Sequence, residues 1–130
     1  MDAEQALREL GELSSQITAA AVLDANGTVL AASSEDPAAS GRLATAALEL
    51  VAAAADLGSG SREVTRVEVE LDEGAIFVVN ESGHTVAATT GPRPTSGLVV
   101  YDLRTCAQSI DAAPKKRRAR ERKETKETEA

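Results

Sequence analysis

The segment from Gly74 to Thr90 constrains the fold most, because its pattern is that of a β-hairpin. Ile76–Val79 is an unbroken apolar run rich in β-branched residues, and Val86–Ala88 follows it after the turn-forming dipeptide Ser82-Gly83. With that dipeptide as the loop, every facing pair between the two runs is apolar: Val79 with Val86, Val78 with Ala87, and Phe77 with Ala88. A strand without polar alternation is covered on both faces. The segment therefore predicts a hairpin in the middle of a sheet that has helices on both sides.

The rest of the chain offers the helices and outer strands that such a sheet needs. Apolar residues at helical spacing predict amphipathic helices over Ala3–Leu13 and from Gly97 to about Ile110. Ile17–Leu23 and Thr28–Ser33 are strand-length runs joined by an Asn-Gly turn, so they predict a second hairpin. Val64–Leu71 alternates apolar and charged residues, as does a strand with one face in water near a sheet edge.

A long helix is predicted between the two hairpins, and it carries more apolar surface than one contact can cover. It begins at Asp36-Pro37 or at the alternative cap Ser40, and Gly58 is a natural end. Its leucine, valine and alanine residues occupy two neighbouring stripes. We therefore expect this helix to pack on its own sheet and on a second partner, for which the same helix of another copy is a candidate.

The predicted order is helix, two strands, helix, three strands, helix. All strand connections except the one through the long helix are short enough for hairpins. This order predicts an α+β layered fold with a single five-stranded antiparallel sheet and helices on its faces.

The element order and three parts of the sequence resemble the Roadblock (dynein light chain) family, including its bacterial regulators of Ras-like GTPases. These parts are ITAAAVLDANGTVLAAS, the alanine-rich helix, and VEVELDEGAIFVVNESGHTVAATTGPRPTSGLVVYDL, within roughly Glu4 to Ile110. The resemblance implies the strand order 2-1-5-4-3 and a Roadblock/profilin-like layered sandwich, with the long helix on one face and the terminal helices on the other. It also implies a homodimer and a non-enzymatic regulator or adaptor of a small Ras-like GTPase in signalling or motility.

The resemblance and the surplus apolar surface together predict a dimer interface on the long helix and the third strand. An uncovered strand edge is a template for pairing, and pairing two copies removes it. The residues expected at this interface are Leu43, Ala47, Leu50, Val51 and Ala54 on the helix, with Val67 and Val69 on the edge strand.

The charge pattern predicts two parts: a domain over residues 1–111, which the resemblance implies is Roadblock-like, and a basic C-terminal tail over residues 112–130, which we expect to be disordered. The first part carries 6 basic and 17 acidic side chains, and the second carries 8 basic and 4 acidic ones. The tail is either a solvated segment that aids solubility or an arm for an anionic partner, which can also be the acidic body itself. The residues of the expected arm are Lys115, Lys116, Arg117, Arg118, Arg120, Arg122 and Lys123.

Two other functions stay open at this point. The basic tail permits a nucleic-acid-associated protein or one bound to an anionic surface, although the acidic body repels phosphate. A layered α+β fold of this size also permits a small-molecule sensor, with a ligand between helix and sheet. Few polar groups converge inward in the predicted fold, which counts against a sensor.

Residues with catalytic or metal-binding chemistry are sparse, so we expect no enzyme, no cofactor and no metal site. His84, the only histidine, is expected to be a solvated turn residue, and Cys106 a small buried side chain of the last helix. No apolar run reaches about 18 residues, so no transmembrane segment is expected. The acidic N-terminus is unlike a secretory signal, and a cytoplasmic location is the expectation.

Overall fold

The computed structural model describes residues 1–57 and 63–111 and shows a five-stranded antiparallel sheet with three helices. The elements lie in the predicted order, with bounds close to those expected from the sequence. They are α1 (Ala3–Leu13), β1 (Ile17–Leu23), β2 (Val29–Ala32), α2 (Pro37–Leu57), β3 (Arg66–Leu71), β4 (Gly74–Glu81), β5 (His84–Thr90) and α3 (Ser96–Ser109). The strand order is β2-β1-β5-β4-β3, which confirms the predicted α+β fold class and its strand order.

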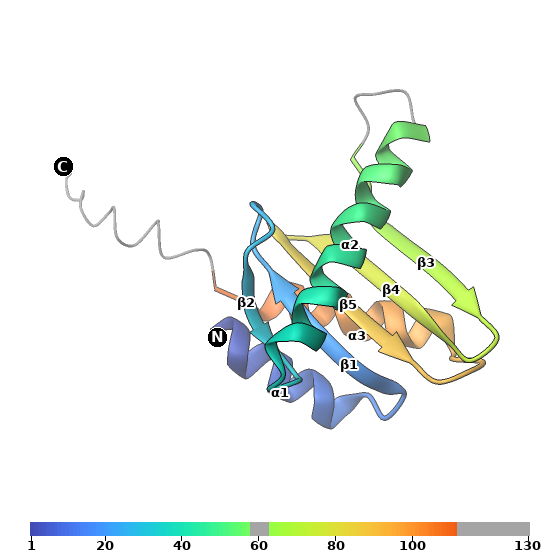
Figure 1. Ribbon diagram of the computed structural model, residues 1–130. Coiled ribbons are helices and arrows are strands. Elements are labelled where there is room, and N and C mark those ends of the chain that lie inside the picture. Colours follow the sequence, from blue (N-terminus) through green and yellow to red (C-terminus); the bar gives the residue numbers. More distant parts are fainter. Residues whose placement is uncertain (58–62, 112–130) are drawn as a thin grey trace.

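The helices divide between the two faces of the sheet. Figure 1 shows α2 alone on one face and α1 and α3 together on the other. The main core lies between the sheet and the α1–α3 pair, and the face toward α2 holds two smaller clusters of buried residues. The face with one helix is therefore the less completely covered one.

The β4–β5 hairpin has the register that its apolar pattern predicts. Val79 pairs with Val86, Val78 with Ala87, and Phe77 with Ala88. The loop residues Ser82 and Gly83 both have positive φ angles, 57° and 82°. Two consecutive left-handed residues make the tight turn whose twist matches that of a hairpin. This loop fixes which side chains of both strands reach the core.

Phe77 is the largest side chain of the main core and is 1% exposed. It lies on β4 and faces the α1–α3 layer, where Leu10 and Leu103 are also buried. The remaining core residues on this face are small, mostly alanine and valine. Much of the buried apolar area therefore depends on a few large side chains, since hydrophobic stabilisation scales with the area removed from water.

The expectation that His84 is a solvated turn residue is wrong. His84 is only 8% exposed, and its Nδ1 has no hydrogen-bond partner. The two-residue turn ends at Gly83, so His84 is the first residue of β5 and shares its sheet face with Val86, a main-core residue. Side chains alternate between the two faces of a strand, so His84 lies on the main-core side although it directly follows the turn.

Cys106 is buried in α3, as expected, and burial raises the pKa of its thiol from 9.0 to about 11. Because the thiolate is the reactive form, we predict slow alkylation at pH 8 in the folded protein and fast alkylation in denaturant. Thr105→Cys, at the exposed neighbouring position, is the control and should react fast without denaturant. Equal rates for Cys106 in folded and unfolded protein would contradict the prediction.

The raised pKa of Cys106 also gives a pH dependence of stability. Between about pH 9 and 11 the unfolded chain releases the thiol proton while the folded chain retains it. The unfolded state therefore binds fewer protons in this range, and the free energy of unfolding falls as the pH rises through it. Below pH 9 this thiol contributes no pH dependence.

Candidate protein interface

Helix α2 is only partly covered by its own subunit. It is 21 residues long, but only Ala44 and Ala47 are buried. Ala44 packs with Ala21 and Leu23, and Ala47 packs with buried side chains of β4 and β5. Alanine side chains allow close contact between the helix and the sheet, but they leave the larger residues beside them at the rim of the contact. Apolar surface therefore remains on both flanks of the helix.

One flank of α2 lies beside open sheet surface on the β3 side. Leu43 and Leu50 are half-buried there, at the border of the cluster formed by Ala47, Val78 and Ala87. A hollow of about 300 Å³ lies between α2 and the strands, and its lining includes Leu43, Ala46 and Ile76. We call the residues Leu43, Ala46, Leu50, Ala54 and Leu57 the β3-side flank; they follow one another at the 3- and 4-residue spacing of a helix face.

Strand β3 continues this surface to the edge of the sheet. Val67 and Val69 are half-buried on the α2 face, and Leu71 is 63% exposed. Thr65 accepts a backbone hydrogen bond from Asn80 (2.9 Å), and bonded residues alternate along an antiparallel strand. The backbone groups of Val67, Val69 and Leu71 therefore point toward β4. Those of Arg66, Glu68 and Glu70 point away from the sheet and have no strand beside them in the described part of the chain.

The seven residues expected at a dimer interface lie on α2 and β3 around this flank, with Val51 under the helix toward its other flank, and they are not equally accessible. Ala47 is 0% exposed and packs on the sheet, so its side chain cannot touch a second copy. Val51 also leans on that cluster and keeps only part of its surface free. Leu43, Leu50 and Ala54 retain exposed surface on the helix, as do Val67 and Val69 on the strand. Ala47 therefore packs within the subunit and is removed from the set of predicted interface residues.

By length and composition alone, α2 could also cross a membrane. An 18-residue window within it has a mean hydropathy of 1.2, and 11% of that window is buried. This corrects the expectation of no such segment, which rested on uninterrupted runs; Arg42, Glu49 and Asp56 interrupt the apolar sequence. The helix contacts β1, β2, β3 and β5. Its exposed apolar surface nevertheless needs a partner.

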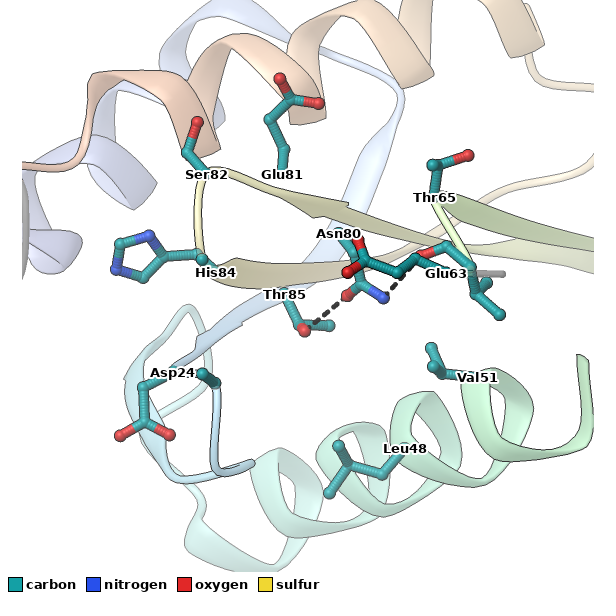
Figure 2. Close-up of a pocket in the computed structure, with 13 residues that line it drawn as sticks. Asp24, Leu48, Val51, Glu63, Thr65, Asn80, Glu81, Ser82, His84 and Thr85 are labelled. Atoms are coloured by element: carbon teal, nitrogen blue, oxygen red, sulfur yellow. Dashed lines mark hydrogen bonds between the residues drawn. The ribbon is translucent and has the colours of Figure 1, made fainter. Parts of the chain in front are cut away.

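A second hollow, of about 350 Å³, lies on the opposite flank of α2 (Figure 2). Leu48 and Val51 form its helical wall, and Asn80 and Thr85 lie across from them. The Asn80 amide is already used, because its Nδ2 donates to the Val64 carbonyl (2.9 Å) and its Oδ1 accepts from the Thr85 hydroxyl (2.6 Å). These bonds fix the chain just before β3 onto β4. The Asn80 and Thr85 side chains in this hollow thus serve the fold and are not free to bind a small molecule.

The positions that could carry chemistry are scattered. Among residues 1–57 and 63–111, no group of three His, Cys, Asp or Glu side chains could hold a metal ion. His84 faces the main core, and Glu68, Glu70, Asp72 and Glu73 are exposed, as a solvated face requires. The basic arm from Lys115 to Lys123 lies outside the described residues.

Solved structures with this arrangement exist, although no protein-family model and no curated protein matches the sequence. A Roadblock/LC7 domain from Streptomyces avermitilis superposes with a TM-score of 0.71 and is 25% identical, over 84% of this chain and 94% of that one. The chain has the Roadblock/LC7 fold. The resemblance stated from the sequence is thereby confirmed.

Two further structures share the Roadblock/LC7 arrangement at lower identity. The gliding protein MglB from Thermus thermophilus has a TM-score of 0.64 and 20% identity, over 82% of this chain and 85% of that one. A chain of the LokiProfilin2–rabbit actin complex has a TM-score of 0.57 and 13% identity, over 80% and 91%. At these identities the likeness is one of fold alone, and it includes the profilin-like relationship expected from the sequence.

Proposed function

We propose that the protein is a homodimeric regulator or adaptor of a small Ras-like GTPase, acting through protein–protein contact and without bond chemistry of its own. The observation that carries the proposal is the β3-side flank of α2 together with the uncovered edge of β3. The flank is apolar and partly exposed, and the outer edge of β3 has backbone groups without a neighbouring strand in the described part of the subunit. The two surfaces adjoin each other. Large contiguous apolar surface of this kind marks interaction sites in proteins.

The fold supports the GTPase part of the proposal. Roadblock-type proteins are scaffolds and regulators of Ras-like GTPases, and a Roadblock/LC7 domain and the gliding protein MglB have the same fold as this chain. A dimer would bury one flank of each α2 and leave the α1–α3 layer and the other flank free for a GTPase.

A binding experiment tests the GTPase proposal. The purified protein is mixed with each small Ras-like GTPase of its own organism, loaded with GDP or with a non-hydrolysable GTP analogue. We expect one GTPase to co-elute in a complex that depends on the bound nucleotide, and isothermal titration calorimetry then gives its affinity. Hydrolysis rates with and without the protein distinguish an activator from a scaffold. If no GTPase binds in either nucleotide state, the proposal is wrong.

The basic arm gives a second candidate, an association with an anionic partner such as duplex DNA. Seven of the nine residues from Lys115 to Lys123 are basic, whereas residues 1–111 are acidic. Contacts to phosphate release counterions, so affinity should fall steeply between about 50 and 200 mM salt. The measurement compares the full chain with a variant ending at Asp111, by fluorescence anisotropy with labelled DNA. Equal binding by both variants, or none by the full chain, would reject this candidate.

A further inference from the structure

We propose that the basic arm, Lys115–Lys123, docks on its own subunit in the acidic hollow of Figure 2. The docked arm covers the flank of α2 that carries Leu48, so a protein that binds this flank has to displace it. Three features carry this inference: the charge of the hollow, its apolar wall, and the place where the arm begins. The inference depends neither on the homodimer nor on a GTPase.

The hollow carries negative charge that the described subunit does not compensate. Asp24, Glu63 and Glu81 line it, and none of the described residues of its lining is Lys or Arg. Asp24 accepts from two backbone N–H groups of its own loop, and Glu81 accepts from Gln108 Nε2 (3.0 Å). These donors are neutral, and no ion pair reaches the three carboxylates within residues 1–57 and 63–111. A cationic occupant would therefore relieve the repulsion between them.

The hollow combines these carboxylates with an apolar wall from α2. Leu48 is 42% exposed there, and Val51 lies on the same wall. Long basic side chains suit such a surface, because their methylene stems cover apolar atoms while their charged ends reach carboxylates. A bare metal ion does not, since no group of three His, Cys, Asp or Glu side chains in the described part of the chain could hold one. The surface thus favours lysine and arginine side chains.

The arm begins at the end of the sheet where the hollow lies. The Asp111 N–H donates to the Met1 carbonyl (2.8 Å), and the Met1 ammonium donates to Asp111 Oδ1 (2.9 Å). One helical turn earlier, Gln108 is bonded to Glu81, so α3 ends beside the β4–β5 loop. Figure 2 shows Glu81 pointing toward α3 and Glu63 beside Asn80. These carboxylates therefore mark a path from the end of α3 around the sheet into the hollow.

The covalent length of the chain allows the arm to follow this path. Lys115 is four residues beyond Asp111 and Lys123 is twelve, so they reach at most about 14 Å and about 40 Å from it. A short tether raises the effective concentration of the arm at the hollow to the order of millimolar. Ion pairs that are individually weak at an exposed site can then hold the arm in place.

The outer face of α1 is the rival acidic surface. Glu4, Glu9 and Glu12 are exposed on it, but Arg8 lies among them and offsets part of their charge. Exposed ion pairs on a helix surface contribute little by themselves, whereas the hollow adds apolar contact for the side-chain stems. The hollow is therefore the better site for the arm.

Backbone amide NMR spectra of the full chain and of a variant ending at Asp111 locate the arm. Every described helix and strand lies before Asp111, so both chains contain the same elements. At about 20 mM salt we expect chemical-shift differences, apart from those beside the truncation, to centre on Leu48, Val51 and Thr85. They should fade by about 300 mM salt, because screening shortens the range of the attraction. Differences on the outer face of α1 instead, or none at low salt, would overturn the proposal.

Two triple variants of equal net charge separate the hollow from a general attraction to the acidic body. Asparagine and glutamine keep an acceptor oxygen for the loop of Asp24 and for Gln108, so the fold is retained. The hollow variant carries Asp24→Asn, Glu63→Gln and Glu81→Gln. The control variant carries, at the opposite end of the sheet, Glu70→Gln, Asp72→Asn and Glu73→Gln.

A synthetic peptide of residues 112–130 is titrated into both triple variants and into the unmodified sequence, each ending at Asp111. We expect the hollow variant to bind the peptide on the order of tenfold more weakly than the unmodified sequence, and the control variant to stay within about twofold. Equal weakening in both variants would show diffuse attraction and overturn docking in the hollow. Circular dichroism verifies that all three chains are folded.

A mixing experiment tests whether the arm docks on its own subunit. Isotope-labelled chain ending at Asp111 is mixed with unlabelled full chain at low salt. Docking within one subunit leaves the labelled amides of the hollow unmoved, and it makes the shifts of the full chain independent of its concentration. Movement of the labelled hollow amides would show that the arm passes to another copy and would overturn docking within the subunit.

Discussion

Phe77→Ala is expected to lower the free energy of unfolding by about 3–5 kcal/mol. Phe77 is the only phenylalanine of the chain and the largest of its fully buried side chains. The buried residues nearest to it on the sheet are Ala75, Val79 and Ala88, whose short side chains cannot extend into the space that the ring leaves. A domain of this size is stabilised by only about 5–15 kcal/mol, so the loss would be a large part of the total.

Urea denaturation followed by circular dichroism measures this change, at one protein concentration because the proposed dimerisation would shift the apparent stability. Tyr101→Ala is the matched control, since Tyr101 is the only other aromatic residue and is 67% exposed on α3. We expect the control to change stability by less than about 0.5 kcal/mol. Equal effects of the two substitutions would show that the core does not depend on Phe77.

Leu50→Asp is expected to dissociate the proposed dimer while the subunit stays folded. Leu50 is half-exposed on the β3-side flank of α2, so the carboxylate of an aspartate there stays hydrated in the separate subunit. In the dimer the same carboxylate would be buried without a partner, at a cost on the order of 3–5 kcal/mol. This cost corresponds to a dissociation constant roughly a hundredfold or more weaker.

Leu48→Asp is the matched control for this experiment. Leu48 lies on the opposite flank of the same helix and is 42% exposed, so the chemical change and the helix are the same. Sedimentation velocity over a concentration series gives both dissociation constants, and circular dichroism checks the fold. A dimer that survives Leu50→Asp but is lost in Leu48→Asp would move the interface to the other flank.

The helices and strands could be predicted from the sequence because their local signals agree with the final fold. The Ser82-Gly83 turn set the register of β4 and β5, and strict alternation identified β3 as a strand with one exposed face. The half-burial of α2 followed from two apolar stripes on one helix. In each case the residues that form an element also carry the pattern that identifies it.

The misses arose where contacts distant in sequence decide the outcome. His84 was expected in water, but its burial depends on the helices that cover that face of β5. Ala47 belongs to an apolar stripe, but only its packing against Val78 and Ala87 shows that it faces inward. The role of Asn80, which ties the chain before β3 onto β4, has no signature in the sequence at all.

The two ends of the sheet differ, and this difference limits how far the chain can assemble. If two β3 strands join, the outer strands of the pair are the two copies of β2. Strand β2 has four residues, and its pairing with β1 is irregular between Val22 and Leu23. Because β2 is short and irregular, its free edge presents few backbone groups with which a strand of another molecule could pair. Growth would then stop at two copies, which guards the protein against fibre formation.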